Sequence, residues 1–491
     1  MIEQTKITFL FVFTFFMCFI QVKSQRWEVS NSIMSNDNVA INKSLIDNNN
    51  NLYAIGHFKG DLTIGDSFYS ASSSDIYISR FNSDFSLAWS NKIGGPGFDF
   101  QGSMAYNNSN IYLTGPFGNN GQVCYFSAND SLVSDGSWDV YLANYSTNGV
   151  LQWKKHIGRG ASNQFDSRIT VGDNSNLLVP ITYKDSIQIS DTIIYGTPGA
   201  FNNSISKFSN NGTLIWSKNI KATGDVFIEE VSFFSNSYFF IGRYKDTIFY
   251  ENDTVVGSTN NFDIFLLKTS HNGEIDSTSW IKSFKGNYND VAGSLTQDSY
   301  GNFYFTGYFQ SDSLFIDSNN VLINEYSPNE DFYLIKYNKN GELQWAKSFG
   351  RAGNDRATDM SVKDDILYVT GMFSDTIIFG DDTLHSNGTG DADFFLGTFD
   401  TDGNKLRAVG IKSYGSGDEF GKSISVSSDI SAFVSASFKS DSIIIGDSLY
   451  RRQGTRNSFI GKYVPLFSAT FDSKTNASCN NGADGSLSVK T

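Results

Sequence analysis

The sequence contains little cysteine, little proline and little histidine. Of its 491 residues, only three are cysteine and six are proline, so neither a disulfide framework nor rigid proline-rich linkers organise the chain. The four histidines share no motif, and neither a Gly-x-Ser-x-Gly nucleophile motif nor a phosphate-binding loop is present. The sequence therefore offers no recognisable catalytic constellation. The histidines are His57, His156, His271 and His385.

Runs of lysine and arginine are also absent. The formal net charge of the chain is −14. A chain this acidic repels a phosphate backbone, which makes nucleic acid an unexpected partner. The charge balance instead favours a soluble protein that attracts cations.

The sequence has one continuous apolar run, at residues 7–20, and this run is short for a membrane span. It follows Lys6 and is followed by Val22-Lys23-Ser24, which is the arrangement of an export signal. Residues 1–24 are therefore predicted to be a signal peptide. We expect the mature chain to be secreted or displayed at the cell surface, and not to be an integral membrane protein.

Aromatic residues and glycine are abundant. The chain contains 43 Phe, 24 Tyr and 44 Gly. Phe and Tyr are favoured on pleated surfaces, and glycine suits tight turns. This composition predicts an all-β protein.

Six tryptophans recur at intervals of 62 to 65 residues. A fixed period of this size is typical of a repeat architecture. We interpret these tryptophans as structural residues that pack between neighbouring repeats, with an exposed aromatic surface for glycans as the alternative. They are Trp27, Trp89, Trp153, Trp216, Trp280 and Trp345.

Each repeat reads as four strands. In the fifth repeat, strands are expected at residues 291–297, 302–309, 331–337 and 343–349, with a small hairpin near residues 314–317. Asn340-Gly341 precedes the last of these strands, and an Asn-Gly or Asp-Gly pair occupies this place in five repeats. The pair predicts a two-residue hairpin turn that joins the third and fourth strands.

The two ends of the repeat array complement each other. Trp27 belongs to a lone fourth strand at the start, whereas the seventh repeat, after Asp418, has three strands and then departs from the pattern. Pairing the first strand with the last repeat would remove exposed sheet edges. The sequence thus predicts a seven-bladed β-propeller of four-stranded blades over residues 25–467, closed by the N-terminal strand completing the last blade.

Three phrases of the fifth repeat recur along the chain, namely DFYLIKY at 331–337, NGELQWAK at 340–347 and YFTGYF at 304–309. They resemble the SBBP β-propeller repeat of secreted bacterial proteins. The resemblance covers about residues 27–463. It implies a propeller fold and export from the cell.

A second resemblance concerns the tail. Residues 475–486 (TNASCNNGADGS) resemble the opening of the SprB-type repeat of surface adhesins from gliding bacteria of the Bacteroidota type. The resemblance implies cell-surface display, often through the type IX export route, and a role in adhesion or gliding motility. Residues 468–491 are accordingly predicted to be the truncated start of an adhesin-like repeat module.

An aspartate precedes the first strand of every repeat. If the first strands line a central channel, these carboxylates form a ring near one mouth, where they could hold Ca²⁺ or another hard cation. The simpler interpretation is that each accepts backbone N–H bonds in its own turn. The series is Asp37, Asp99, Asp166, Asp225, Asp290, Asp355 and Asp418.

A second Asp/Asn series begins the third strands, and we interpret it as a feature of turns or sheet edges. Its members are Asp75, Asp139, Asn203, Asp263, Asp331, Asp393 and Asn457.

The function expected from these observations is a non-enzymatic, exported binding or display module of an adhesin-like protein. Its ligand would be a protein or a carbohydrate, and it would be a monomeric ring within a longer chain that needs no cofactor other than the Ca²⁺ considered above. One alternative is a secreted hydrolase or lyase that acts on polysaccharides with paired carboxylates. A pocket with a paired, pKa-shifted carboxylate would favour that alternative. A purely structural spacer is the other.

Overall fold

The computed structural model describes residues 26–100, 102–107, 109–159, 164–388, 390–465, 470–475 and 486–490. For residues 29–30, 164–167, 470–475 and 486–490 it describes the backbone only. The chain divides into one unit at Trp27–Tyr463 and another made of Met1–Arg26 and Val464–Thr491. The predicted signal peptide lies outside the described residues, as do residues 476–485 of the SprB-like phrase. In the second unit, β43 (Thr470–Thr475) and β44 (Ser486–Lys490) form an antiparallel hairpin.

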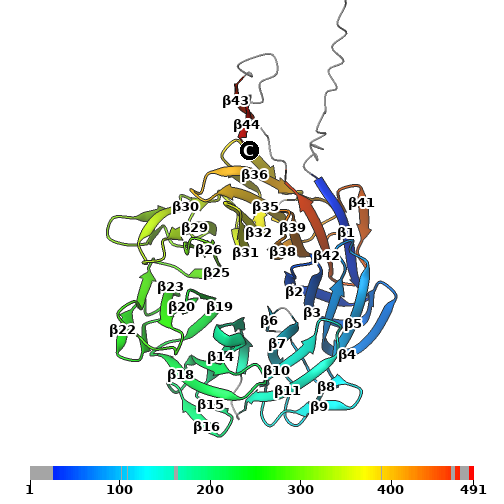
Figure 1. Ribbon diagram of the computed structural model, residues 1–491, viewed down its shortest axis with the longest axis vertical. Helices are drawn as coiled ribbons and strands as arrows, with labels where there is room; N and C mark the ends of the chain where they lie inside the picture. The colour runs from blue at the N-terminus through cyan, green and yellow to red at the C-terminus, as the bar shows by residue number, and fades with distance from the viewer. Residues whose placement is uncertain are drawn as a thin grey trace, which may run out of the picture. The chain divides into compact units, whose positions relative to one another are not determined.

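The Trp27–Tyr463 unit is all-β, as predicted. Its strands fall into seven groups of antiparallel neighbours arranged around a common centre (Figure 1). The groups are β2 (Asn38–Ile46), β3 (Leu52–Ile64), β4 (Ser67–Phe81) and β5 (Leu87–Ile93); β6 (Ser103–Asn107), β7 (Asn110–Phe117), β10 (Asp139–Ser146) and β11 (Leu151–Gly158); β12 (Gln164–Ser167) with β13 (Thr170–Val171), β14 (Leu177–Lys184), β17 (Phe201–Phe208) and β18 (Leu214–Ala222); β19 (Val226–Phe234), β20 (Ser237–Tyr244), β23 (Asp263–Ser270) and β24 (Trp280–Phe284); β25 (Asp290–Gln297), β26 (Phe303–Phe309), β29 (Asp331–Tyr337) and β30 (Leu343–Phe349); β31 (Asp355–Lys363), β32 (Ile366–Ser374), β35 (Ala392–Asp400) and β36 (Lys405–Gly410); and β38 (Glu419–Val426), β39 (Ala432–Phe438), β42 (Asn457–Val464) and β1 (Arg26–Ser35).

Small hairpins connect the second and third strands of six groups, and the hairpin predicted near residues 314–317 is among them. In the first group, extensions of β3 and β4 take their place. β1 also pairs with β3, and β18 pairs with β21 (Thr247–Tyr250), which joins adjacent groups into larger sheets. The hairpins are β8 (Val123–Ser127) with β9 (Asp130–Val133), β15 (Ser186–Ile189) with β16 (Thr192–Tyr195), β21 (Thr247–Tyr250) with β22 (Asp253–Val256), β27 (Ser313–Phe315) with β28 (Val321–Ile323), β33 (Thr376–Phe379) with β34 (Asp382–His385), and β40 (Ser442–Ile445) with β41 (Ser448–Arg451) and β37 (Lys412–Tyr414).

Helical structure is limited to a short 3₁₀ turn at Asp173–Ser175 in the described part of the chain. Among the same residues, no helix has the length and apolar character needed to cross a membrane.

The hydrophobic core lies between successive groups. The second and third strands, such as β26 and β29, are buried on both faces, because each sheet packs against a neighbour on either side. In the packing between the fourth and fifth groups, Phe239 contacts Phe303 with ring centroids 4.8 Å apart. The first and last groups pack in the same way, since Phe85 stacks on Phe433 at 5.5 Å.

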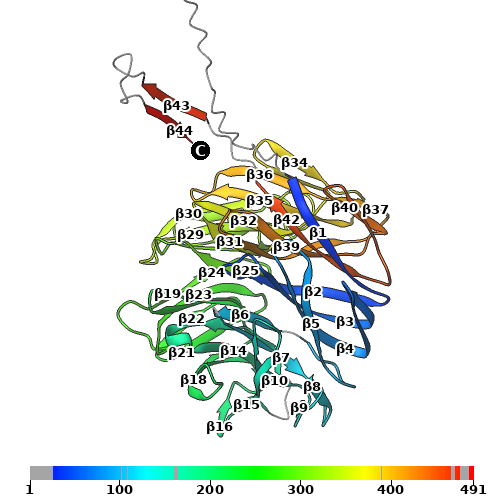
Figure 2. The same ribbon diagram turned by 45° about the vertical axis from the view of Figure 1, so that its right-hand side comes forward.

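Hydrogen bonds also join the first and last groups. The Ile41 N–H of the first group donates to Ser458 Oγ of the last group at 3.2 Å. β1, from the start of the chain, lies beside β42 at its far end (Figure 2).

The turns before the fourth strands differ from the expected two-residue type. That type needs positive φ at both central residues, but at Asn148-Gly149 only the glycine has it, with φ of 79°. The Gly149 N–H donates to the carbonyl of Ser146, and Ser146 N–H donates to that of Val150. A register irregularity follows in the β10–β11 ladder. The turn is therefore a longer loop with glycine in the left-handed region and an adjacent bulge.

The tryptophans explain why glycine occupies these turns. Five of the six lie against the turn glycine of the following group, and a Cβ at Gly341 would come within 2.7 Å of Trp280 Nε1. Trp89 Nε1 also donates to the carbonyl of Thr147 in the next group, at 2.9 Å. Trp27 differs, because it packs on Gly461 of the neighbouring strand β42. The contacting pairs are Trp89 with Gly149, Trp153 with Gly212, Trp216 with Gly273, Trp280 with Gly341 and Trp345 with Gly403.

A substitution at this contact tests its contribution to stability. Gly341→Ala combines a positive φ of 79° with a clash against Trp280, so we expect it to lower the free energy of unfolding by about 3 kcal/mol. Gly199→Ala is the control, because Gly199 has a φ of 81° but open space around it, and it should cost only about 1 kcal/mol. Denaturant unfolding measures both. Equal losses would show that the tryptophan contact contributes nothing.

Candidate functional site

The first strand of each group carries one equivalent position that faces the centre. It is the residue that pairs with the third residue of the YFTGYF-like phrase in the second strand. A β-bulge comes just before it in five groups, and such bulges redirect side chains. The seven equivalent residues are Lys43, Ser103, Ser167, Glu230, Ser294, Asp359 and Ser423.

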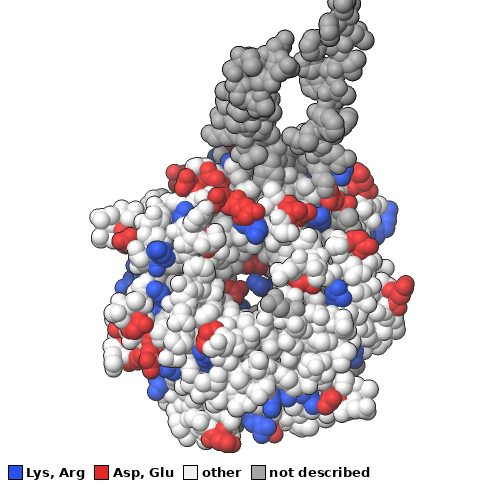
Figure 3. All heavy atoms as spheres, viewed as in Figure 1, with Lys and Arg blue, Asp and Glu red and all other residues white. Residues whose placement is uncertain are grey.

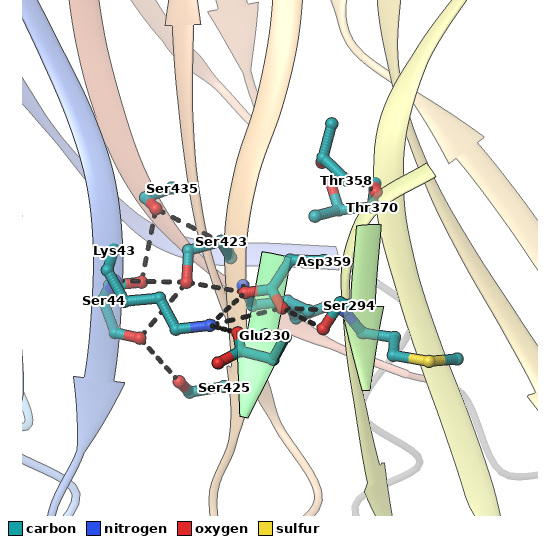
Figure 4. Close-up of polar contacts among 12 residues, drawn as sticks. Lys43, Ser44, Glu230, Ser294, Thr358, Asp359, Thr370, Ser423, Ser425 and Ser435 are labelled. Carbon is teal, nitrogen blue, oxygen red and sulfur yellow. Dashed lines mark hydrogen bonds and ion pairs between the residues drawn. The ribbon is translucent and has the colours of Figure 1, made fainter. Parts of the chain in front are cut away.

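Three of these seven positions are charged, whereas the other four are serine. The three charged side chains, Lys43, Glu230 and Asp359, come from β2, β19 and β31 and meet one another (Figure 4). Lys43 Nζ lies 3.2 Å from Glu230 Oε2 and 3.4 Å from Asp359 Oδ2. One ammonium group thus bridges two carboxylates from strands that are distant in the sequence.

Asp359 is the best-satisfied member of this cluster. Its side chain is only 6% exposed. Its carboxylate accepts hydrogen bonds from Ser294 Oγ at 2.7 Å and from Ser423 Oγ at 2.8 Å. It also accepts the Ile424 N–H at 3.0 Å. Two serines of the same ring position therefore hold this carboxylate between β25 and β38.

Lys43 is held in its charged form. Burial alone would lower its pKa, but the carboxylates of Asp359 and Glu230 more than offset burial and raise the pKa. Its neighbour Ser44 connects the cluster to the last group, because Ser44 N–H donates to Ser423 Oγ at 3.1 Å. The cluster is thus a fixed charge network at the centre of the strand arrangement.

A polar cavity of about 210 Å³ surrounds this network. The space-filling view shows a hollow at the centre in which acidic and basic side chains are both visible (Figure 3). Every one of the seven groups contributes to its lining, through Asn42 and Lys43, Gly102 and Ser103, Arg168, Glu229 and Glu230, Gly293, Thr358 and Asp359, and Lys422.

Lys422 is the charged lining residue with no anionic partner among the described residues. It lies at the bulge of β38, where its Nζ is 5.1 Å from the ring centroid of Phe420. Burial, together with the positive charges of Arg456, Arg356 and Lys439, lowers the pKa of Lys422 to about 8. An uncompensated ammonium group in a polar cavity favours the binding of an anion.

An aromatic residue stands two positions before several of the cavity-lining residues in the sequence. Phe227 precedes Glu229, and its ring lies 5.0 Å from the guanidinium of Arg243. Phe100 precedes Gly102 and stacks on Trp138 at 5.4 Å. Such surfaces bind ligands that present both apolar faces and negative charge.

The structure places the first-strand aspartates apart from one another, around the unit. Asp37 pairs with Lys59 at 3.2 Å, and Asp418 pairs with Lys439 at 2.8 Å. Asp225 accepts the Phe201 N–H at 3.0 Å. The side chain of Asp166 lies outside the described residues. Calcium binding by this series therefore stays a prediction.

The remaining three, Asp99, Asp290 and Asp355, are fully buried. Asp99 accepts the Gly95 N–H and Asp355 accepts the Arg351 N–H, each within its own turn. Asp290 accepts Ser311 Oγ at 2.8 Å. Through these hydrogen bonds each carboxylate holds a loop beside its own strand.

The third-strand series is buried in strands that lie in the middle of their sheets, so the sheet-edge interpretation is wrong and the turn interpretation remains. Asp75, Asp139 and Asp263 have no exposed surface. Asp139 and Asp263 each accept a hydrogen bond from the preceding loop, as when Asp263 Oδ1 accepts the Ser258 hydroxyl at 3.2 Å. Asp75 instead contacts Lys92. These residues are buried because their strands lie in the middle of the sheets. The sequence pattern at the start of a strand does not show which position the strand takes in its sheet.

Carboxyl groups of the two series meet where consecutive groups join. A Cβ at Gly350 would come within 2.1 Å of Asp331 Oδ1 and 2.9 Å of Asp355 Oδ2, so both carboxyls face one small space. Burial, and then the charge of Glu325, raises the pKa of Asp331 to about 7. Burial, and also the charge of Asp331, raises the pKa of Asp355 to about 8.

The same pairing recurs at three other junctions. Burial raises the pKa of Asp99 to about 6 and that of Asp290 to about 7, and the charges of Asp75 and Asp263 add to the respective shifts. At the last junction Glu419, the neighbour of Asp418, takes the place of the aspartate, and burial and a hydrogen bond with Asp393 raise its pKa to about 8. A catalytic pair would occur once, so recurrence at four junctions indicates an architectural feature.

Sequence reasoning missed the charge network. Its signal was the presence of Lys, Glu and Asp at a ring position that is otherwise serine, such as Ser294 and Ser423. The position becomes visible only when the bulges fix the register of the first strands. The aspartate before the first strand recurs in every repeat, so the sequence pattern favoured that series as the candidate site and not the cavity.

Comparisons with known proteins add little. No family model matches the chain, and no curated protein matches it, so the resemblance to SBBP and SprB repeats stays a prediction. Solved structures that match include the WD40 β-propeller domain of Doa1, with 9% identity, a TM-score of 0.42 and coverage of 89% of this chain and 97% of that chain. An apocarotenoid oxygenase of Synechocystis matches with 9% identity, a TM-score of 0.42 and coverage of 88% and 94%. A Trypanosoma rangeli sialidase matches with 12% identity, a TM-score of 0.35 and coverage of 73% and 57%. TM-scores this low carry no argument about function.

Proposed function

We propose that the chain is an exported binding module, a closed seven-bladed propeller of the SBBP type displayed at a cell surface by an adhesin-like protein. Its central cavity would receive a polar, acidic group of a surface ligand, a carbohydrate in preference to a protein. The observation that carries the proposal is Lys422, an ammonium group that has no anionic partner in the described part of the chain and lines a polar cavity shared by all seven groups.

Ring closure is supported by the packing of the first and last groups. Phe85 stacks on Phe433, Ile41 donates to Ser458, and Ser44 donates to Ser423. These contacts span almost the full length of the chain. With them, each blade would have a neighbour on either side.

A carbohydrate is favoured by the size and chemistry of the cavity. Its volume of about 210 Å³ is below the ~300–1,000 Å³ typical for drug-sized ligands, so it suits one small group at the end of a larger ligand. The neighbouring rings, such as Phe227 and Phe420, offer apolar faces. Lys422 offers a charge that selects an acidic group over a neutral one.

A binding role is preferred over catalysis because the carboxylates of the cavity are all paired with cations. Lys43 bridges the carboxylates of Glu230 and Asp359, which leaves neither of them free as a general acid or base. The observation that favours the hydrolase or lyase alternative is Asp331, a carboxyl with a raised pKa that lines a surface pocket of about 310 Å³. Carboxyl pairs with raised pKa values recur at other junctions, however, and this recurrence favours a structural role.

A glycan array with matched variants tests the proposal. The wild-type chain is expected to bind acidic carbohydrates, and Lys422→Thr, which introduces the residue found at the same position of β31, should weaken that binding at least tenfold. Lys412→Thr, at an exposed lysine of β37, is the control and should bind as the wild type does. Binding that survives in Lys422→Thr would contradict the site. An array without any bound carbohydrate would favour the structural spacer.

A further inference from the structure

One histidine lies in a cluster of possible metal ligands, away from the central cavity. His156 is on β11, whereas Asp135 and Asp139 come from the loop before β10 and from its first residue. A nitrogen of His156 and one oxygen of each carboxylate lie within 4.8 Å of one another. His156 Nε2 is 2.9 Å from Asp139 Oδ2, and Nδ1 is 4.0 Å from Asp135 Oδ2.

Two buried atoms of this cluster lack a hydrogen-bond partner in the described part of the chain. They are His156 Nε2 and Asp139 Oδ1, and the two side chains are only 5% and 0% exposed. Nε2 approaches the carboxylate closely, but not in the direction of a hydrogen bond. An unsatisfied buried nitrogen and an unsatisfied buried oxygen are costly unless another group binds them.

The equivalent site in the preceding group contains a simple ion pair between a lysine and an aspartate. Lys92 holds the same place on β5, because it pairs with Tyr77 as His156 pairs with Tyr141. Its ammonium group contacts Asp75, which corresponds to Asp139. The substitution of histidine for lysine replaces a pure donor with a metal-binding nitrogen.

We propose that His156, Asp139 and Asp135 form a binding site for Zn²⁺ or a similar first-row transition-metal ion. Imidazole and carboxylate are the ligands such ions prefer, whereas Ca²⁺ and Mg²⁺ prefer oxygen alone. Three protein ligands leave one tetrahedral position for water or a ligand group.

The surroundings support this geometry. The Asp135 N–H donates to Asp139 Oδ2 and orients that carboxylate, as outer hydrogen bonds do in metal sites. The ring of Phe117 packs edge-on against His156 at 5.1 Å. Asp135 is 54% exposed, so the ion can reach the site from solvent. Arg159 pairs with Asp135 at 3.2 Å, but so exposed a pair is readily displaced.

The test uses the full chain without a histidine tag. Wild-type protein is expected to bind one Zn²⁺ in calorimetric titration, to gain at least ~2 °C in Tm at saturation, and to give a visible absorption band with Co²⁺. His156→Lys copies the Lys92 arrangement, so it should fold as the wild type does and lose all three signals. Lys92→Ala is a second control that should retain them, and any effect of Ca²⁺ on Tm should be the same in the wild type and in His156→Lys.

Two results would overturn the proposal. The first is a wild-type chain that binds neither Zn²⁺ nor Co²⁺. The second is equal binding by wild type and His156→Lys, which would place the metal elsewhere on this acidic protein. Because His156 is far along the chain from Lys422 and is no part of the cavity lining, neither result bears on carbohydrate binding.

Discussion

Lys43→Met is expected to lower the free energy of unfolding by about 3–5 kcal/mol, the loss seen when one partner of a buried ion pair is removed. Lys43 is the sole cation that bridges Glu230 and Asp359 in the described network. Without it, two carboxylates remain largely buried near one another. Their desolvation is then uncompensated, and their mutual repulsion adds to the loss.

The triple variant Lys43→Ser, Glu230→Ser and Asp359→Ser should be considerably more stable than Lys43→Met. It removes all three charges together and restores the serine that occupies the other four ring positions. The comparison is a test of non-additivity, because residues of one network do not contribute independently. Denaturant unfolding of the wild type and both variants measures it.

A triple variant less stable than Lys43→Met would contradict this account. It would mean that the network stabilises the fold by more than the desolvation of its charges costs. The expected order instead implies that these charges are kept for the cavity and not for stability, since buried ion pairs are poor stabilisers in comparison with neutral residues.

The architecture could be predicted from the sequence because the repeat multiplies weak signals. The strand at 331–337 is short, but its phrase recurs in every repeat, and β29 has those bounds. Trp280 and Gly341 likewise show their spacing in the sequence. Their contact across two groups explains why both recur with the same period.

The cavity could not be predicted, because its chemistry lies in departures from the repeat. Lys43 and Asp359 differ from the serine of the other repeats, and their partnership depends on the bulges and on how the first and sixth groups face each other. Sequence periodicity reports what the repeats share. It does not show which side chains that occur in a single repeat come into contact in the folded structure.

The carboxyl pairs at the junctions predict a pronounced pH dependence of stability. In the unfolded chain an aspartate loses its proton near pH 4, whereas Asp355 in the folded chain keeps it up to about pH 8. Between these values the folded state binds more protons. Stability is therefore fully present below about pH 4, as far as these groups are concerned, and is lost as the pH rises through 6 to 8.

The expected loss of stability as the pH rises is large. Each pKa unit corresponds to about 1.4 kcal/mol, and Asp99, Asp290, Asp331, Asp355 and Glu419 all have raised pKa values between about 6 and about 8. We expect the free energy of unfolding to fall by several kcal/mol between pH 5 and pH 9, less than five independent groups would give, because the two carboxyls of each pair titrate together. Thermal unfolding across this range measures it.

The variant Asp355→Asn tests the contribution of a single carboxyl pair, Asp331 and Asp355. Its amide can donate to Asp331 at any pH, so the variant should be more stable than the wild type at pH 8.5 and nearly equal to it at pH 5. Asp447→Asn, at an exposed residue, is the control and should leave the pH profile unchanged. A profile that stays as steep in Asp355→Asn as in the wild type would show that the junction carboxyls do not govern it.

The same pH series separates protons from calcium as the group that neutralises these carboxyls. If protons alone do so, millimolar Ca²⁺ at pH 8.5 leaves Tm unchanged, and the calcium interpretation of the first-strand aspartates is wrong. If Ca²⁺ raises Tm in the wild type but not in Asp355→Asn, the ion occupies the space that Asp331 and Asp355 share. In either case the repulsion between two buried carboxylates must be relieved, because the fold brings them together at four junctions with no lysine or arginine in contact with Asp331, Asp355 or Asp290 among the described ion pairs.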